Sequence, residues 1–108
     1  MNRVAYRSGE ARYKAEQCQP AMELLSRALA GAPQEPAAPT ALLNLADCQF
    51  RGNRPAESLA TLRQVWVQYP QAPEAREAAS RLNRIAGGEG WRPTPDDYFG
   101  RALSFLTL

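Results

Sequence analysis

The hydrophobic residues of this chain recur every three or four positions, and prolines and glycines divide them into six short segments. This spacing is typical of amphipathic α-helices. Even the β-prone stretch 65–67 fits it, because Leu59, Leu62, Val65 and Tyr69 fall on one helical face. The pattern therefore predicts an all-helical chain, with helices over residues 3–15, 19–32, 39–51, 55–69, 73–86 and 95–107.

The chain also repeats itself at a spacing of 37 residues. Residues 32–36 then fall on residues 69–73, and Tyr13 falls on Phe50. The period is close to the ~34 residues of helix-pair repeats. A third copy begins near Pro73 and loses register at the glycine-rich stretch 87–90. The predicted organisation is about two and a half repeat units over residues 1–86, a Gly/Pro loop over 87–94 and an apolar helix over 95–108.

Small and large apolar residues alternate within each unit in the pattern of one known repeat family. In the second unit the pattern positions are Leu42, Leu45, Ala46, Ser58, Leu62, Val65 and Pro70. With these residues the chain resembles the tetratricopeptide repeat. The resemblance implies an all-α fold in which helical hairpins stack as a short right-handed solenoid.

The stretch 66–75, with its Tyr-Pro-x-x-Pro sequence, resembles the repeats of bacterial envelope proteins. Examples of this type are the Tol-system periplasmic repeat protein, the lipoprotein of the outer-membrane assembly machine and the helical domain of soluble lytic transglycosylases. The resemblance implies the periplasm or cell envelope as the compartment if a leader lies outside this chain, and the cytoplasm otherwise.

In this family the first helix of each unit lines a concave inner surface, where partners are expected to bind. The resemblance places Tyr13 and Phe50 there as aromatic anchors among charges of both signs, a combination typical of peptide recognition. The alternative, that these two rings pack between repeats, stays open. The predicted partner-binding residues are Tyr6, Glu10, Tyr13, Lys14, Leu43, Asp47, Phe50, Arg51 and Arg84, and the same wall would include Arg3, Thr40, Glu77 and Ser80.

Composition argues against catalysis and against several classes of ligand. The chain has no His, the commonest general base and metal ligand, so neither a catalytic residue nor a metal or other cofactor is predicted. Its 13 Lys and Arg are interspersed with 11 Asp and Glu, which does not indicate nucleic-acid binding. No stretch approaches the ~20 apolar residues that cross a bilayer, so membrane insertion is not predicted.

The two cysteines have no CxxC companion that would indicate a zinc site. Cys18 lies near the start of the second predicted helix and Cys48 near the end of the third, at neighbouring ends of antiparallel helices. Two buried free thiols are the favoured interpretation. A disulfide, as would form in an oxidising periplasm, is the alternative.

The last predicted helix is apolar around most of its circumference. The apolar side chains of such a helix are expected to be buried against something. Self-association through Phe99, Leu103 and Leu106 would bury them. The alternative is that the helix folds back on the repeats with Trp91 as a packing anchor.

Together these patterns predict a non-catalytic scaffold that binds a peptide or helix of another protein on its concave face. The alternative is a helical superstructure segment of a bacterial cell-wall lytic transglycosylase without the catalytic domain. The stretch 92–97 followed by Arg101-Ala102 resembles that family, but no Glu-Ser pair of its catalytic core is present.

Overall fold

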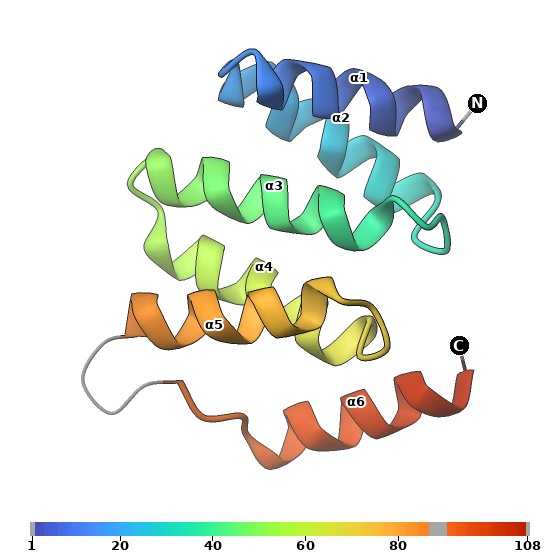
Figure 1. The fold of residues 1–108 in the computed structure, drawn as a ribbon, viewed down its shortest axis with the longest axis vertical. Helices are drawn as coiled ribbons and strands as arrows, with labels where there is room; N and C mark the ends of the chain where they lie inside the picture. Colours follow the sequence, from blue (N-terminus) through green and yellow to red (C-terminus); the bar gives the residue numbers. More distant parts are fainter. Residues whose placement is uncertain (1, 87–90, 108) are drawn as a thin grey trace.

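The computed structural model describes residues 2–86 and 91–107 of the chain. Within these ranges every regular element is an α-helix, which confirms the predicted all-helical fold (Figure 1). The predicted boundaries lie within one residue of those observed. The helices are α1 (Asn2–Lys14), α2 (Cys18–Gly31), α3 (Ala38–Arg51), α4 (Pro55–Gln68), α5 (Glu74–Ala86) and α6 (Pro95–Thr107).

The turns inside the first two hairpins are conformational copies of each other. Each has three residues, and the middle one has a left-handed backbone, with φ of 61° at Glu16 and 62° at Asn53. The N–H of Gln17 bonds the carbonyl of Arg12, and the N–H of Arg54 bonds that of Gln49, each at 2.9 Å. These hydrogen bonds close the last turn of α1 and of α3. Because the paired positions are 37 residues apart, the sequence repeat is also a repeat of backbone geometry.

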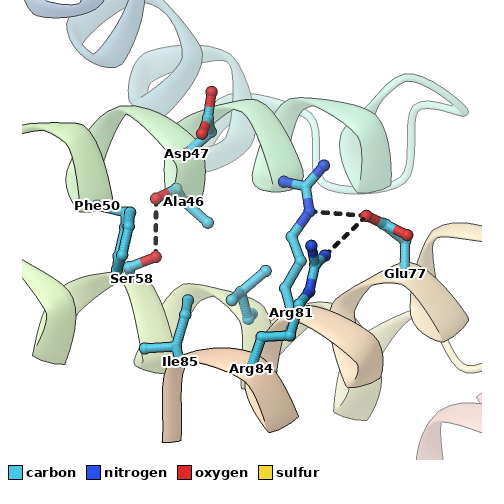
Figure 2. Close-up of a pocket in the computed structure, with 9 residues that line it drawn as sticks. Ala46, Asp47, Phe50, Ser58, Glu77, Arg81, Arg84 and Ile85 are labelled. Atoms are coloured by element: carbon cyan, nitrogen blue, oxygen red, sulfur yellow. Dashed lines mark hydrogen bonds and ion pairs between the residues drawn. The ribbon is translucent and has the colours of Figure 1, made fainter. Parts of the chain in front are cut away.

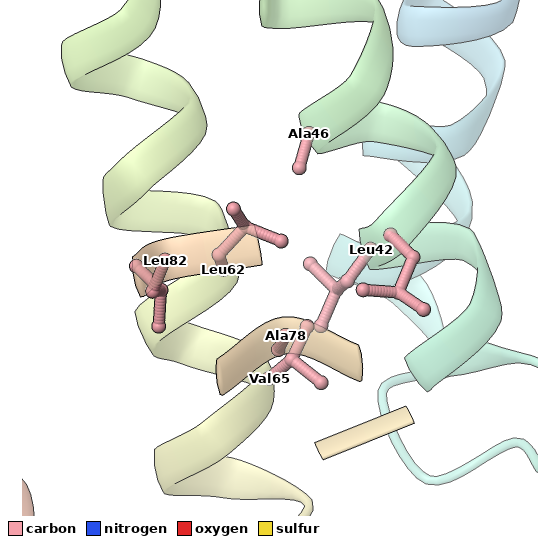
Figure 3. Close-up of a cluster of buried hydrophobic side chains, with 7 residues drawn as sticks. Leu42, Ala46, Leu62, Val65, Ala78 and Leu82 are labelled. Atoms are coloured by element: carbon pink, nitrogen blue, oxygen red, sulfur yellow. The ribbon is translucent and has the colours of Figure 1, made fainter. Parts of the chain in front are cut away.

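The hairpins stack so that α1, α3 and α5 form one layer and α2 and α4 form a second (Figure 1). Two buried clusters lie between the layers, and Leu29 and Tyr69 pack against both. Figure 3 shows the second cluster, built by side chains of α3, α4 and α5. The first cluster is Tyr6, Leu25, Ala28, Ala32, Ala38 and Ala41, and the second is Leu42, Leu43, Ala46, Leu62, Val65, Ala78 and Leu82.

Small residues set the close approach of the helices within each hairpin. A Cβ added to Gly9 of α1 would lie 2.5 Å from Cδ2 of Leu25 in α2, so any larger residue would force the Leu25 side chain to shift. At the equivalent position of the second hairpin, the carbonyl of Ala46 accepts a 2.8 Å hydrogen bond from the Ser58 hydroxyl. This bond satisfies a hydroxyl that is almost completely buried.

A disulfide joins Cys18 at the start of α2 to Cys48 near the end of α3, with the two Cα atoms 5.4 Å apart. The favoured prediction of two free thiols was therefore wrong. The antiparallel arrangement of α2 and α3 brings these helix ends within the range that a disulfide spans. The bond links the second helix of the first unit to the first helix of the second.

Helix α6 does not pack as the helices of the repeat units do. It packs beside α4, and among the described residues none of its Cα atoms lies within 8 Å of a Cα of α5. Trp66 of α4 meets Trp91 and Tyr98 edge-on, at centroid distances of 5.3 and 5.5 Å. The helix thus rests on the second unit with Trp91 against it, but the side chains of Phe99 and Leu106 are 67% and 82% exposed.

The Asp97 carboxylate fixes the start of α6. It accepts hydrogen bonds from the Thr94 N–H at 2.9 Å and from the Arg63 guanidinium at 2.8 Å, while its own N–H donates to the Thr94 hydroxyl. Thr94 and Asp97 thereby satisfy N–H groups that have no partner within the helix. Arg63 ties this cap to α4.

Candidate protein-binding surface

The layer of α1, α3 and α5 is hollowed at two places. The larger pocket has a volume of about 420 Å³ and lies between α3, α4 and α5 (Figure 2). The smaller has about 230 Å³ and lies between α1, α2 and α3. The larger is lined by Ala46, Asp47, Phe50, Ser58, Leu62, Glu77, Arg81, Arg84 and Ile85, and the smaller by Tyr6, Glu10, Leu25, Ala37, Thr40, Ala41 and Asn44.

The two pockets are repeats of one feature. Four lining residues of the smaller pocket recur 37 positions later in the larger one: Glu10 as Asp47, Leu25 as Leu62, Thr40 as Glu77 and Asn44 as Arg81. Stacking therefore places equivalent hollows side by side. Such a series suits an extended ligand that crosses several units.

Asp47 is the centre of a polar network at the rim of the larger pocket. Its Oδ2 accepts a 2.6 Å hydrogen bond from the Tyr13 hydroxyl and lies 3.0 Å from the Arg51 guanidinium. Burial raises the pKa of Tyr13, and so do its hydrogen bond to Asp47 and the negative charge of the Asp47 carboxylate. The Tyr13 hydroxyl therefore stays a donor at neutral pH. The guanidinium of Arg51 lies 5.8 Å from the Tyr13 ring. The network links α1 to α3.

A second charged group lies on α5. Glu77 contacts the guanidinium of Arg81 at 3.0 Å and that of Arg84 at 3.6 Å. Arg81 also reaches the carbonyl of Leu43 in α3 at 3.4 Å. Figure 2 shows both arginines pointing toward Glu77 at one end of the pocket. Charges of both signs are therefore held in place beside the hollow.

The other end of the pocket is apolar. Phe50 of α3 and Ile85 of α5 lie there, well away from Glu77 (Figure 2). The Phe50 side chain is 50% exposed, so half of this large apolar residue is open to a ligand. A partner side chain that covered this ring would remove apolar surface from water.

The structure brings most of the predicted residues to this surface, but not all of them. Asp47, Phe50 and Arg84 line the larger pocket, Glu10 lines the smaller one, and Lys14 forms a 2.8 Å ion pair with Glu10. Tyr6 lines the smaller pocket, but both it and Leu43 are buried.

Tyr6 and Leu43 are only 3% and 7% exposed and belong to the two core clusters. The Tyr6 hydroxyl is satisfied internally by the carbonyl of Ala32 at 2.7 Å. They are buried because the following helices cover them: Tyr6 of α1 packs with residues of α2 and α3, and Leu43 of α3 with residues of α4 and α5. Partner contact stays a prediction for all of the predicted residues.

Sequence reasoning missed Arg81 and Ile85. The i, i+4 spacing of Glu77 and Arg81 was a signal for an ion pair on α5. The 37-residue shift did not reveal Arg81, because its equivalent Asn44 was not in the predicted wall either. The same holds for Ile85, whose equivalent is Cys48.

Neither a metal site nor a membrane span is found in the described part of the chain. No cluster of three or more His, Cys, Asp or Glu is arranged to hold a metal ion among these residues. Of the helices within residues 2–86 and 91–107, none is long and apolar enough to span a bilayer.

Stacked two-helix units with a repeated hollow on one face define a helical-repeat protein. The model of the tetratricopeptide repeat family matches residues 6–82, and the chain belongs to this family. Its repeats generally mediate protein–protein interaction, and the family is generally non-catalytic. No curated protein and no solved structure matches the chain. The resemblance to envelope proteins, and the alternative of a lytic-enzyme segment, stay predictions.

Proposed function

We propose that this chain is a non-catalytic scaffold that binds a peptide or helix of another protein on the surface formed by α1, α3 and α5. The larger pocket beside the half-exposed Phe50 ring is the observation that carries the proposal. An apolar side chain of the ligand would fill the space between Phe50 and Ile85. Burial of a few anchors of this kind supplies most of the affinity in many interfaces.

The charged groups beside the pocket would set the register of the bound segment. Arg84 is 68% exposed and pairs with Glu77 only at 3.6 Å, so it can exchange this contact for an acidic group of the ligand. Arg51 is 50% exposed and pairs with Asp47 within its own helix. Exposed ion pairs are weak, so exchanging them costs little.

We also propose that the chain works in the periplasm or cell envelope. The disulfide between Cys18 and Cys48 supports this compartment, because disulfides persist in oxidising environments and are reduced in the cytosol of most organisms. Expression with and without export, followed by thiol labelling of the denatured protein, tests this directly. Labelled cysteines in the exported protein would contradict the proposal.

Helix α6 offers a separate surface for self-association. Phe99, Leu103 and Leu106 are all exposed and fall on one face at spacings of four and three residues. We expect concentration-dependent dimerisation in sedimentation equilibrium, weakened by Leu106→Glu. A chain that stays monomeric at all concentrations would rule this out.

The binding surface is tested by selecting a ligand peptide from a display library and measuring its Kd by calorimetry. Phe50→Ala should weaken binding about tenfold or more, the effect of an anchor worth about 1.4 kcal/mol. Phe105→Ala is the matched control, because Phe105 is 46% exposed but lies on α6. Equal losses for both variants, or no loss for Phe50→Ala, would count against the proposed surface.

A further inference from the structure

A third pocket lies where the repeat pattern stops. It has a volume of about 490 Å³ and is lined by residues from the end of α4, the following turn, the start of α5 and one residue of α6. It belongs to neither hollow of the α1, α3 and α5 surface. The lining residues that matter here are Trp66, Pro70, Ala75, Arg76, Ala79 and Arg101.

The first repeat unit contains the same site in a filled state. Leu29, Pro33 and Ala38 stand 37 positions before Trp66, Pro70 and Ala75. Here Leu29 and the Tyr69 ring, which the next unit supplies, both pack against the buried cluster that contains Ala38.

The Tyr69 hydroxyl donates a 2.6 Å hydrogen bond to the carbonyl of Pro33. Burial of this hydroxyl raises the pKa of Tyr69, so it remains a donor well above neutral pH. In the first unit, a site of this kind therefore accommodates a tyrosine side chain whose hydroxyl donates a hydrogen bond to a proline carbonyl.

In the second unit no described residue takes the place of Tyr69, although Trp91, Tyr98 and Arg101 contact Trp66. The residue 37 positions after Tyr69 is Leu106, which lies on α6 and is 82% exposed. Eight residues separate α5 from α6, against three in each of the other hairpins, and α6 packs on α4 instead of α5. The displacement of α6 therefore leaves open a site that a following tyrosine would otherwise occupy.

The open site is also electropositive. Arg76 and Arg101 line it, and none of the described residues that line it is a carboxylate. Among the described residues neither arginine forms an ion pair with an acidic side chain, and the buried Nε of Arg101 has no hydrogen-bond partner there. The Arg101 guanidinium stacks 4.2 Å from the Trp66 ring. A buried N–H without an acceptor is costly, and a carboxylate from a ligand would satisfy it.

We propose that this pocket binds a tyrosine side chain of a partner protein that has an acidic residue next to it. The ring enters the pocket beside Ala79 and the edge of Trp66, and the phenol hydroxyl donates to the carbonyl of Pro70, as Tyr69 donates to Pro33. The neighbouring carboxylate pairs with Arg101 and Arg76. This site is independent of the surface around Phe50.

The test uses capped dipeptides and heteronuclear NMR of the full chain. N-acetyl-Tyr-Glu-amide should shift the indole signal of Trp66 and the amide signals of Ala75 and Ala79 in a saturable way. N-acetyl-Phe-Glu-amide, which lacks the hydroxyl, should bind about fivefold more weakly, as expected for one lost hydrogen bond. N-acetyl-Tyr-Gln-amide, which lacks the charge, should also bind more weakly.

Two variants separate the parts of the site. Ala79→Leu fills the pocket and should abolish the shifts, while Arg101→Gln should remove only the preference for Glu over Gln. Phe50→Ala should leave the titration unchanged, so a failure of the concave surface and a failure of this site can be told apart. Absence of saturable shifts at Trp66, or shifts that persist in Ala79→Leu with its helical circular dichroism intact, would overturn the proposal.

Discussion

The hydroxyl of Tyr13 in α1 donates a 2.6 Å hydrogen bond to the carboxylate of Asp47 in α3, 34 positions further along the chain. The same separation recurs between Thr40 and Glu74, at 2.7 Å, and between Arg63 and Asp97, at 2.8 Å. It is three residues shorter than the repeat of 37. Each of these side chains therefore bonds a residue that lies about one helical turn before its own equivalent in the next unit.

Replacement of Tyr13 by phenylalanine tests the bond between the two units. Tyr13→Phe keeps the ring and leaves Asp47 with Arg51, so we expect the free energy of unfolding to fall by about 1 kcal/mol. Urea unfolding followed by circular dichroism measures this. Tyr98→Phe is the control, since Tyr98 is largely exposed, and it should change the stability by much less. Equal effects would mean that the Tyr13 hydroxyl contributes nothing specific.

Alkaline pH should destabilise the fold through its tyrosines. Burial raises the pKa of Tyr6, Tyr13 and Tyr69 above the ordinary value of 10.0. Below that value both folded and unfolded chains hold these protons, so the stabilisation is fully present. Above about pH 10 the unfolded chain loses them first, and stability falls as the pH rises through the folded-state values.

Urea unfolding at about pH 8 and at about pH 11 measures this loss. Tyr69→Phe should show a shallower decline than the wild-type chain, since one of the three groups no longer titrates. A decline of the same steepness would show that Tyr69 is not among the groups responsible.

The sequence predicted the helices well because each boundary has a local cause. Tyr69 shows this: its N–H still bonds the carbonyl of Val65, but the following Pro70 disfavours helical geometry at Tyr69, and α4 ends at Gln68. The 37-residue repeat likewise predicted which residues would be equivalent in the two units, and the pockets and turns follow it.

What the sequence did not determine depends on packing between segments. Tyr6 and Leu43 have the same apolar periodicity whether they face a groove or a core, and only the stacking of the helices decides between the two. The direction of α6 is a similar case. Its path depends on the long connection after α5 and on the contacts of Trp66 and Arg63 with α6, which no local pattern reveals.

The ion pair between Arg63 and Asp97 should make the docking of α6 sensitive to acid. Burial tends to raise the pKa of Asp97, but hydrogen bonds from Arg63 and Thr94 outweigh it, and the pKa lies below the ordinary 3.8. The stabilisation is thus complete above the pKa of the unfolded chain and is lost as the pH falls through the folded-state value.

Asp97→Asn keeps an oxygen that can accept from the Thr94 N–H but removes the charge that faces Arg63. We expect it to cost about 1 to 2 kcal/mol at neutral pH and to make the acid limb of the stability curve flatter. The fluorescence of Trp66 and Trp91 reports the contact with α6. Asp96→Asn is the control, because Asp96 is exposed and has no ion pair in the described structure. A curve with an unchanged acid limb in Asp97→Asn would exclude this ion pair as the cause.

Reduction of the disulfide should lower the stability of the whole stack. Cys18 and Cys48 are 30 residues apart in sequence, and closing a loop of this length restricts the unfolded chain by about 3 to 4 kcal/mol in the entropic model. Because the bond joins α2 to α3, its loss acts on the contact between the two units rather than within one hairpin. We therefore expect a reductant to shift the midpoint of urea unfolding to a lower concentration.

The double variant Cys18→Ser with Cys48→Ser separates loss of the covalent bond from other effects of the reductant. Oxidised wild-type protein should be more stable than the variant, and the reductant should leave the variant unchanged. Cys48 is 1% exposed, so its replacement by serine adds the cost of a buried hydroxyl. Reduced wild-type protein should for this reason lie between the other two. If oxidised and reduced wild-type chains unfolded at the same urea concentration, the bond would not stabilise the packing of α2 against α3.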